Sequence, residues 1–240
     1  MKKKMALLLA LILAIGLLGG CDAFSSFQSG SKKYAPYVQS LLDMAYKNET
    51  EKYLELVDDT KQGADDYYED MMQSWADSLA GYFLIEKDML NDDAINELLL
   101  NITKDIFSKA KYEVAEAVKT DDYYTVKLTI EPIIYCDLAF NEAQSYSTSM
   151  VERAKAGEFG EVTVSDDGGL SGFADDNEYI EWERQYALGM LDVMKSYVSK
   201  IEYADPVVKI VQIEEDDEGY GVDFNTLQEI DSAIFVWSTQ

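Results

Sequence analysis

Residues 58–69, DDTKQGADDYYE, carry oxygen ligands at spacings that could hold a calcium ion. In an EF-hand loop, acidic ligands occupy positions such as 1, 9 and 12, and glycine occupies position 6. The matching residues here are Asp58, Gly63, Asp66 and Glu69. Positions 3 and 5, where the strong pattern has Asp or Asn, are threonine and glutamine, so calcium binding would be weak. Gly63 is more simply a helix-ending glycine followed by acids that suit the next helix. We therefore keep the three acids only as weak metal candidates.

A second acidic segment, SDDGGLSGFADDNE at residues 165–178, combines aspartates with glycines. Its spacing matches no known calcium-ligand scheme, so a solvated loop is the simplest prediction. Binding residues are often carried on loops, and the length and glycines of this segment make it the best recognition loop in the chain. The candidate residues are Asp166, Asp167, Asp175 and Asp176.

The chain contains no histidine, which excludes Ser-His-Asp and Cys-His nucleophilic sites and histidine-containing zinc sites. The S-x-x-K run at 108–111 lies where a helix is expected to lead into a strand, and its companion motifs are missing. The serine in GLSG, residues 169–172, has no histidine base. The 46 acidic residues produce close carboxylate pairs by abundance alone. We predict no catalytic residue and no cofactor, with a histidine-free hydrolase of cell-wall glycan or peptide as an alternative.

The strongest functional signal surrounds Cys21. The chain opens with three lysines, a fourteen-residue apolar run from Met5 to Leu18, and two glycines before the cysteine. As a helix this run spans about 21 Å, which is short of the ~20 residues that cross a hydrocarbon core. Charged, apolar and small-residue regions in this order are typical of an export signal. We predict a signal peptide over residues 1–20.

The run Leu18-Gly19-Gly20-Cys21 resembles the lipobox of bacterial lipoproteins. The resemblance implies that Cys21 receives a diacylglyceryl thioether, that Gly20 is the last residue removed, and that Cys21 becomes the mature N-terminus. Two acyl chains, at ~0.8 kcal/mol per buried methylene, hold a protein stably on a membrane. Residues 21–33 then form a lipid-anchored tether with a reach of about 20 Å. The folded part would lie at the outer face of the cytoplasmic membrane.

The second cysteine, Cys136, has no disulfide partner if the sulfur of Cys21 carries lipid. Its neighbours in IEPIIYCDLAF are largely apolar, so a buried, inert thiol is the expected state.

The charge of the chain limits its partners. The formal net charge is −26, and removal of residues 1–20 takes away three lysines and no acid, which makes it −29. Nucleic acid and anionic lipid surfaces attract clustered Lys and Arg, so neither is an expected partner. A basic or neutral protein or cell-wall partner is compatible with this charge, and so are cations.

The apolar spacing predicts an α+β fold. Helical spacing covers 34–49, 50–57, 64–86, 94–110, 136–157 and 177–201, with Asp92 or Asp93 as a cap. Alternating apolar and polar residues predict β-hairpins over 111–133 and 206–227. An isolated hairpin is only marginally stable, so we expect the two hairpins to join into one antiparallel sheet covered by helices.

The order of elements repeats and suggests an internal duplication. Matched residues are Lys104 with Lys195, Tyr112 with Tyr203, Tyr124 with Tyr220, and Leu128 with Phe224. We expect a first half over 34–134 and a second half over 135–240, which together form one compact unit.

The segments YVQSLLDMAYK, YLELV and KYEV…VKTDDYYTVKLTIEP, within residues 34–134, are similar to lipoproteins of Gram-positive, clostridia-like bacteria. That group implies no activity. The sequence thus favours a membrane-anchored extracytoplasmic lipoprotein that acts as a non-catalytic binding or interaction module. The alternatives are the histidine-free hydrolase and a low-affinity calcium binder.

Overall fold

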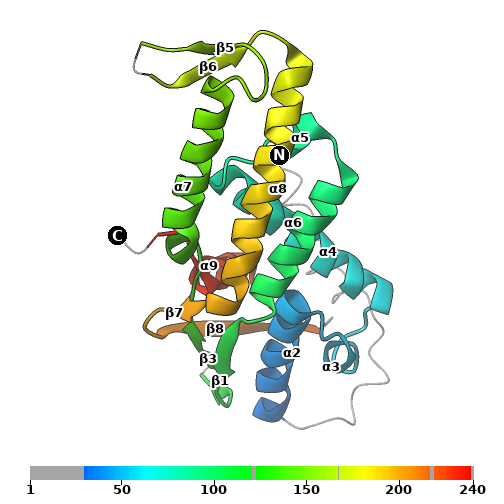
Figure 1. Cartoon of the computed structure of the whole chain (residues 1–240). Coiled ribbons are helices and arrows are strands. Elements are labelled where there is room, and N and C mark those ends of the chain that lie inside the picture. The colour runs from blue at the N-terminus through cyan, green and yellow to red at the C-terminus, as the bar shows by residue number, and fades with distance from the viewer. Residues whose placement is uncertain (1–29, 121–122, 167, 217–218, 239–240) are drawn as a thin grey trace. The chain divides into compact units, whose positions relative to one another are not determined.

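The computed structural model describes residues 30–120, 123–166, 168–216 and 219–238 (Figure 1). Gly20 and Cys21 lie outside these residues. The chain divides into two compact units. Unit 1 comprises Met1–Met71, Phe107–Ile133 and Tyr203–Val236, and unit 2 comprises Met72–Ile106, Ile134–Glu202 and Trp237–Gln240. Each unit therefore contains segments from both predicted halves. The boundary between the halves stays a prediction.

The helices of the structure agree closely with the apolar spacing, except that α5 was not predicted and α9 begins where a strand was predicted. They are η1 (Gly30–Lys33), α2 (Tyr34–Lys47), α3 (Glu51–Leu54), α4 (Lys61–Tyr82), α5 (Lys87–Leu90), α6 (Asp93–Phe107), α7 (Cys136–Lys155), α8 (Asp176–Tyr197), η2 (Val198–Lys200) and α9 (Phe224–Ile234). Asp92 accepts hydrogen bonds from the backbone N–H groups of Ala94 and Ile95, as expected for an N-terminal cap of α6. Within the described residues, no helix is long and apolar enough to span a bilayer.

In the part of the chain that the structure describes, the strands form three sheets. They are β1 (Lys111–Val114), β2 (Val118–Lys119), β3 (Tyr124–Glu131), β4 (Ile133–Ile134), β5 (Val162–Val164), β6 (Leu170–Phe173), β7 (Glu202–Tyr203), β8 (Val207–Asp216), β9 (Gly219–Val222) and β10 (Phe235–Val236). The largest sheet has the order β1-β3-β8-β9, with β2 also paired to β3. The others are β10-β4-β7 and the hairpin β5-β6.

The large sheet of unit 1 confirms the predicted joining of the two hairpins. Strand β3 of the first hairpin pairs along its length with β8 of the second, from Tyr124 opposite Ile213 to Ile130 opposite Val207. Alternate residues of β3 and β8 are buried, and they form the inner face of the sheet. These inner residues are Val126, Leu128, Ile130, Val211 and Ile213. The α+β fold follows directly from this arrangement.

Helices α2 and α9 cover the inner face of the sheet. The ring of Tyr34 on α2 lies 4.5 Å from that of Tyr124 on β3 and 5.5 Å from that of Tyr220 on β9. Helix α9 contacts β3 and β8, and the Tyr46 hydroxyl of α2 donates to Asp231 on α9. Both helices therefore pack on the same face and leave the opposite face of the sheet exposed.

In unit 2, α7 and α8 lie side by side, with the hairpin β5-β6 at the end where α7 ends and α8 begins (Figure 1). Gly189 of α8 allows this close approach, because a Cβ atom there would lie 2.0 Å from the Tyr146 hydroxyl oxygen of α7. The buried residues of these two helices include several small or flexible side chains, namely Ala139, Ala143, Met150, Ala187, Met190 and Met194. Small residues and methionines let the two helices pack tightly.

Three sequence-based expectations are corrected. Gly63 lies inside α4 and does not end a helix. Residues 165–178 are not one loop, since they include β6 and the first turn of α8. The second hairpin ends at Val222, because the Asp223 side chain accepts hydrogen bonds from the backbone N–H groups of Asn225 and Thr226 and starts α9.

The predicted repeat holds only in part. Tyr112 and Tyr203 both lie in strands that follow a helix. However, Leu128 lies in the middle of β3, whereas its match Phe224 begins α9. The correspondence therefore breaks down within the second hairpin.

Candidate functional site

The acidic segment 58–69 does not form a twelve-residue loop. Asp66 and Glu69 lie within α4 and are exposed. A Cβ atom at Gly63 would lie 2.5 Å from Oδ1 of Asp59, so a glycine lets the start of α4 approach that side chain. In the part of the chain that the structure describes, no group of three or more His, Cys, Asp or Glu residues is placed to hold a metal ion. The geometry thus gives Asp58, Asp66 and Glu69 no common site.

The aspartates of the predicted recognition loop occupy different environments. Asp175 caps α8, where its Oδ1 accepts from the backbone N–H of Asn177 at 2.7 Å, and this hydrogen bond lowers the pKa of the carboxyl group. Asp176 is the first residue of α8. Asp166 is exposed between β5 and β6, and Asp167 lies outside the described residues. Asp175 therefore has a structural role, and the structure does not gather Asp166, Asp175 and Asp176 into one site.

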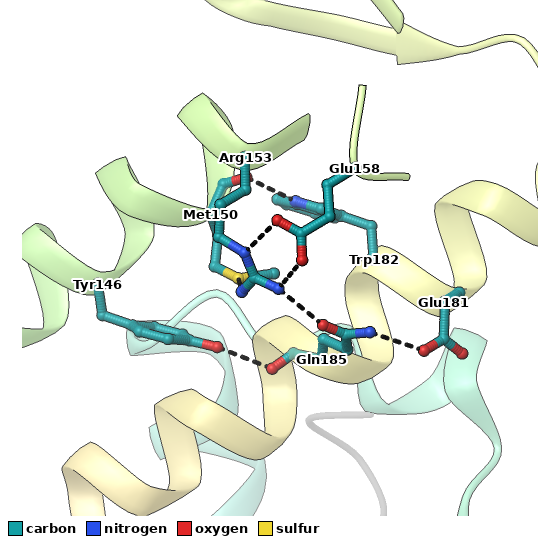
Figure 2. A network of polar contacts seen from close by, with 7 residues as sticks. All are labelled: Tyr146, Met150, Arg153, Glu158, Glu181, Trp182 and Gln185. Carbon is teal, nitrogen blue, oxygen red and sulfur yellow. Dashed lines mark hydrogen bonds and ion pairs between the residues drawn. The ribbon is translucent and has the colours of Figure 1, made fainter. Parts of the chain in front are cut away.

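A polar network joins α7 to α8 around Arg153 (Figure 2). The guanidinium donates to both carboxylate oxygens of Glu158 and, at 3.0 Å, to Oε1 of Gln185. The Gln185 amide donates in turn to Glu181, and its backbone carbonyl accepts from the Tyr146 hydroxyl at 2.8 Å. These groups satisfy one another. The network therefore fixes two helices together and does not present a guanidinium to an anionic ligand.

Aromatic rings continue this contact along α8. The Trp182 indole donates to the carbonyl of Met150 at 3.1 Å, and its ring stacks 5.4 Å from Tyr186 and 6.1 Å from Tyr179. Phe173 of β6 lies 5.7 Å from Trp182 and so attaches the hairpin to the helix. The cluster thus stabilises unit 2 through ring packing and one indole hydrogen bond.

Two partly buried pairs of a tyrosine hydroxyl and a carboxyl group stabilise unit 1. The Tyr46 hydroxyl donates to Asp231 at 2.5 Å, and the Tyr112 hydroxyl donates to Asp43 at 2.6 Å. Burial, followed by the neighbouring carboxylate, raises the pKa of both tyrosines, so both phenols stay neutral. Burial also raises the pKa of Asp231. These phenols are hydrogen-bond donors and not phenolate nucleophiles.

Cys136 and Glu183 are among the titratable groups that are buried in unit 2. Cys136 is 0% exposed, which confirms the predicted burial, and this burial raises the pKa of its thiol, so the thiolate is disfavoured. Glu183 is 2% exposed and accepts a hydrogen bond from the backbone N–H of Glu86 at 3.0 Å. Burial raises the pKa of the Glu183 carboxyl group. Neither group lies at an exposed surface where a substrate could reach it.

The exposed surface with the clearest binding character is the outer face of the large sheet. We use "outer sheet face" for the residues of β2, β3 and β8 that point away from α2 and α9. They are Val118, Thr125, Lys127, Thr129, Val208, Ile210 and Gln212, which the strand register places in adjacent rows. Val118 is 62% exposed, Val208 53% and Ile210 61%. An exposed group of β-branched side chains is a common feature of interaction surfaces.

The sequence predicted these strands but not this exposed face. In the segment VVKIVQI of β8, apolar residues occupy positions that point to both faces of the sheet. That pattern is typical of a strand covered on both sides. Helices cover only one side here, so the apolar residues that point to the other side are exposed. These extra apolar residues were the sequence signal from which the exposed face could have been predicted.

The sequence matches no known protein family and no curated protein. The fold resembles the crystal structure of a candidate lipoprotein (ycdA) from Bacillus subtilis, with a TM-score of 0.52 and 12% sequence identity. The similarity covers 86% of this chain and 57% of the Bacillus chain, so this chain spans little more than half the length of that protein. At this identity the similarity establishes the fold alone.

Proposed function

We propose that this protein is a lipoprotein anchored through Cys21 at the outer face of the cytoplasmic membrane, where its folded part binds another macromolecule without catalysing a reaction. The observation that carries the proposal is the run Leu18-Gly19-Gly20-Cys21 directly after an apolar segment too short to span a bilayer. The shared fold with a candidate lipoprotein of a Gram-positive bacterium supports it.

The chemistry of the folded part supports a binding role. The buried thiol of Cys136 and the buried phenols of Tyr46 and Tyr112 have raised pKa values, which disfavour their nucleophilic forms. Arg153, one of two arginines in the chain, is held by Glu158 and Gln185. In contrast, the outer sheet face exposes apolar side chains that a partner could cover.

Metabolic labelling tests the anchor. Cells that express the full chain are grown with an alkyne analogue of palmitate, and the protein is isolated and conjugated to a fluorophore. Wild type and the matched control Cys136→Ser should both be labelled and should sediment with membranes. Cys21→Ser should lose the label, because the acceptor sulfur is gone. Equal labelling of Cys21→Ser and wild type would contradict the proposed lipid anchor at Cys21.

A further inference from the structure

One edge of strand β8 is open to another strand. Residues Val207–Gln212 pair with β3 on one side, whereas β9 pairs only with Ile213–Asp216. Within the described residues, no strand lies beside Val207–Gln212 on the side away from β3. An exposed edge presents backbone N–H and C=O groups that can pair with an added strand. Peptide recognition by strand addition uses edges of this kind.

The side chains of this edge are unusually apolar. Val207 is 37% exposed, Val208 53% and Ile210 61%, and all three are β-branched. Natural proteins usually protect an edge with charged residues or bulges. The one charged residue in the segment, Lys209, is engaged with Glu229 of α9, with 3.1 Å between Nζ and Oε2. The lysine is therefore held by α9 and gives the edge little protection.

Charge indicates what kind of segment fits this edge. Glu214 is exposed on β8 just beyond the segment, whereas Glu229 of α9 is already paired with Lys209. The whole chain carries a formal charge of −26, so a second copy or an acidic segment would be repelled. A segment that carries lysine or arginine next to apolar residues would avoid this repulsion.

We infer that Val207–Gln212 of β8 binds an extended segment of another protein, which adds to the sheet as a strand. Apolar side chains of the added strand pack beside Val208 and Ile210, and its lysine or arginine side chains lie near Glu214. Backbone pairing provides affinity, and the alternation of apolar and basic residues provides selectivity. The inference rests on the proposed binding role and names its partner class.

A designed peptide tests this inference. Full-length protein in detergent micelles is titrated into the fluorescein-labelled peptide KVTVKVTK, and binding is followed by fluorescence anisotropy. The decisive control is the same peptide with N-methyl groups on all of its backbone amide nitrogens, which keeps the charge and removes the N–H donors from both edges of the peptide. We expect the N-methylated peptide to bind at least about tenfold more weakly. Hydrogen exchange of the β8 amides should slow only with the unmodified peptide.

Substitutions on the protein provide a second, independent comparison. The pair Val208→Thr and Ile210→Thr keeps β propensity and removes apolar contact area, and it should weaken binding by about tenfold. Val164→Thr is the matched control, because Val164 is a 48% exposed residue on strand β5, and it should leave binding unchanged.

Four results would overturn the inference. The first is equal affinity for the N-methylated and the unmodified peptide, which would show that charge attraction alone explains the binding. Absence of binding by both peptides would also overturn it, and so would an unchanged affinity after the paired substitution. Self-association of the wild type that the paired substitution abolishes would show that the edge binds a second copy. Because palmitate labelling does not depend on β8, failure of the strand addition and failure of the anchor are separate outcomes.

Discussion

The replacement Gly189→Ala should destabilise unit 2, although alanine favours helices more than glycine does. A Cβ atom at residue 189 would lie 2.0 Å from the hydroxyl oxygen and 2.3 Å from Cζ of Tyr146. Both distances are far below ordinary contact, so the Tyr146 ring must move. Its hydrogen bond to the carbonyl of Gln185, 2.8 Å long, is then lost.

The expected change in the free energy of unfolding combines two destabilising effects and one stabilising effect. Overpacking costs about 1–3 kcal/mol, and the lost hydrogen bond costs about 0.5–1.5 kcal/mol. Better helix propensity returns about 1 kcal/mol. The free energy of unfolding should therefore fall by about 2 kcal/mol, as measured by urea unfolding of the full chain.

Gly81 of α4 provides the matched control. A Cβ atom there meets nothing within 4 Å, so Gly81→Ala should stabilise the protein by about 0.5–1 kcal/mol or less, since the residue lies in the last turn. Combining Gly189→Ala with Tyr146→Ala should relieve the overlap and give a favourable coupling energy. If Gly189→Ala were as stable as the wild type, the close approach of α7 and α8 would be incorrect.

Two further predictions concern buried titratable groups. In the Cys21→Ser chain, Cys136 should react with a thiol reagent only after denaturation, because it is 0% exposed and burial raises its pKa; fast reaction of the folded chain would contradict this. Burial also raises the pKa of Glu183, so the folded state binds more protons than the unfolded state above the ordinary carboxyl pKa of about 4.3. Stability should consequently fall as pH rises from that value through the raised pKa, and Glu183→Gln should remove this part of the decrease. Urea unfolding between acidic and neutral pH checks the slope, and identical profiles for variant and wild type would refute the assignment.

The parts of the fold that sequence predicted are those with strong local signals. Helix α2 has continuous helical spacing, the start of α6 has the cap Asp92, and from Val126 onward β3 alternates between buried residues and residues that are half-buried or exposed. The joining of the two hairpins into one sheet could be predicted because an isolated hairpin is only marginally stable. These features depend on neighbours in sequence.

The missed parts depend on competing local signals. Asp223 follows an alternating segment, so the predicted strand was extended through it, whereas its side chain caps α9. The glycines of residues 165–178 predicted a loop, yet Leu170–Phe173 pairs with β5 across a bulge. Local patterns there permit two structures, and the side-chain cap of Asp223 and the pairing of β6 with β5 decide between them.

The candidate binding surface could not be derived from sequence for a different reason. The apolar residues of β8 were visible, but which side of the strand stays uncovered depends on where α2 and α9 pack. Likewise, the free edge exists because β9 is four residues long and β8 is ten. Such exposure is a property of the assembled sheet and has no local signature.

The mass of the mature N-terminal peptide tests the central claim most directly. Full-length protein is isolated from membranes of the producing cell, digested with trypsin and analysed by mass spectrometry. The account predicts that the first peptide begins at Cys21, ends at Lys32 and carries a diacylglyceryl group on the cysteine sulfur. A first peptide that begins at another residue, or an unmodified Cys21, would contradict the anchor on which the proposed function rests.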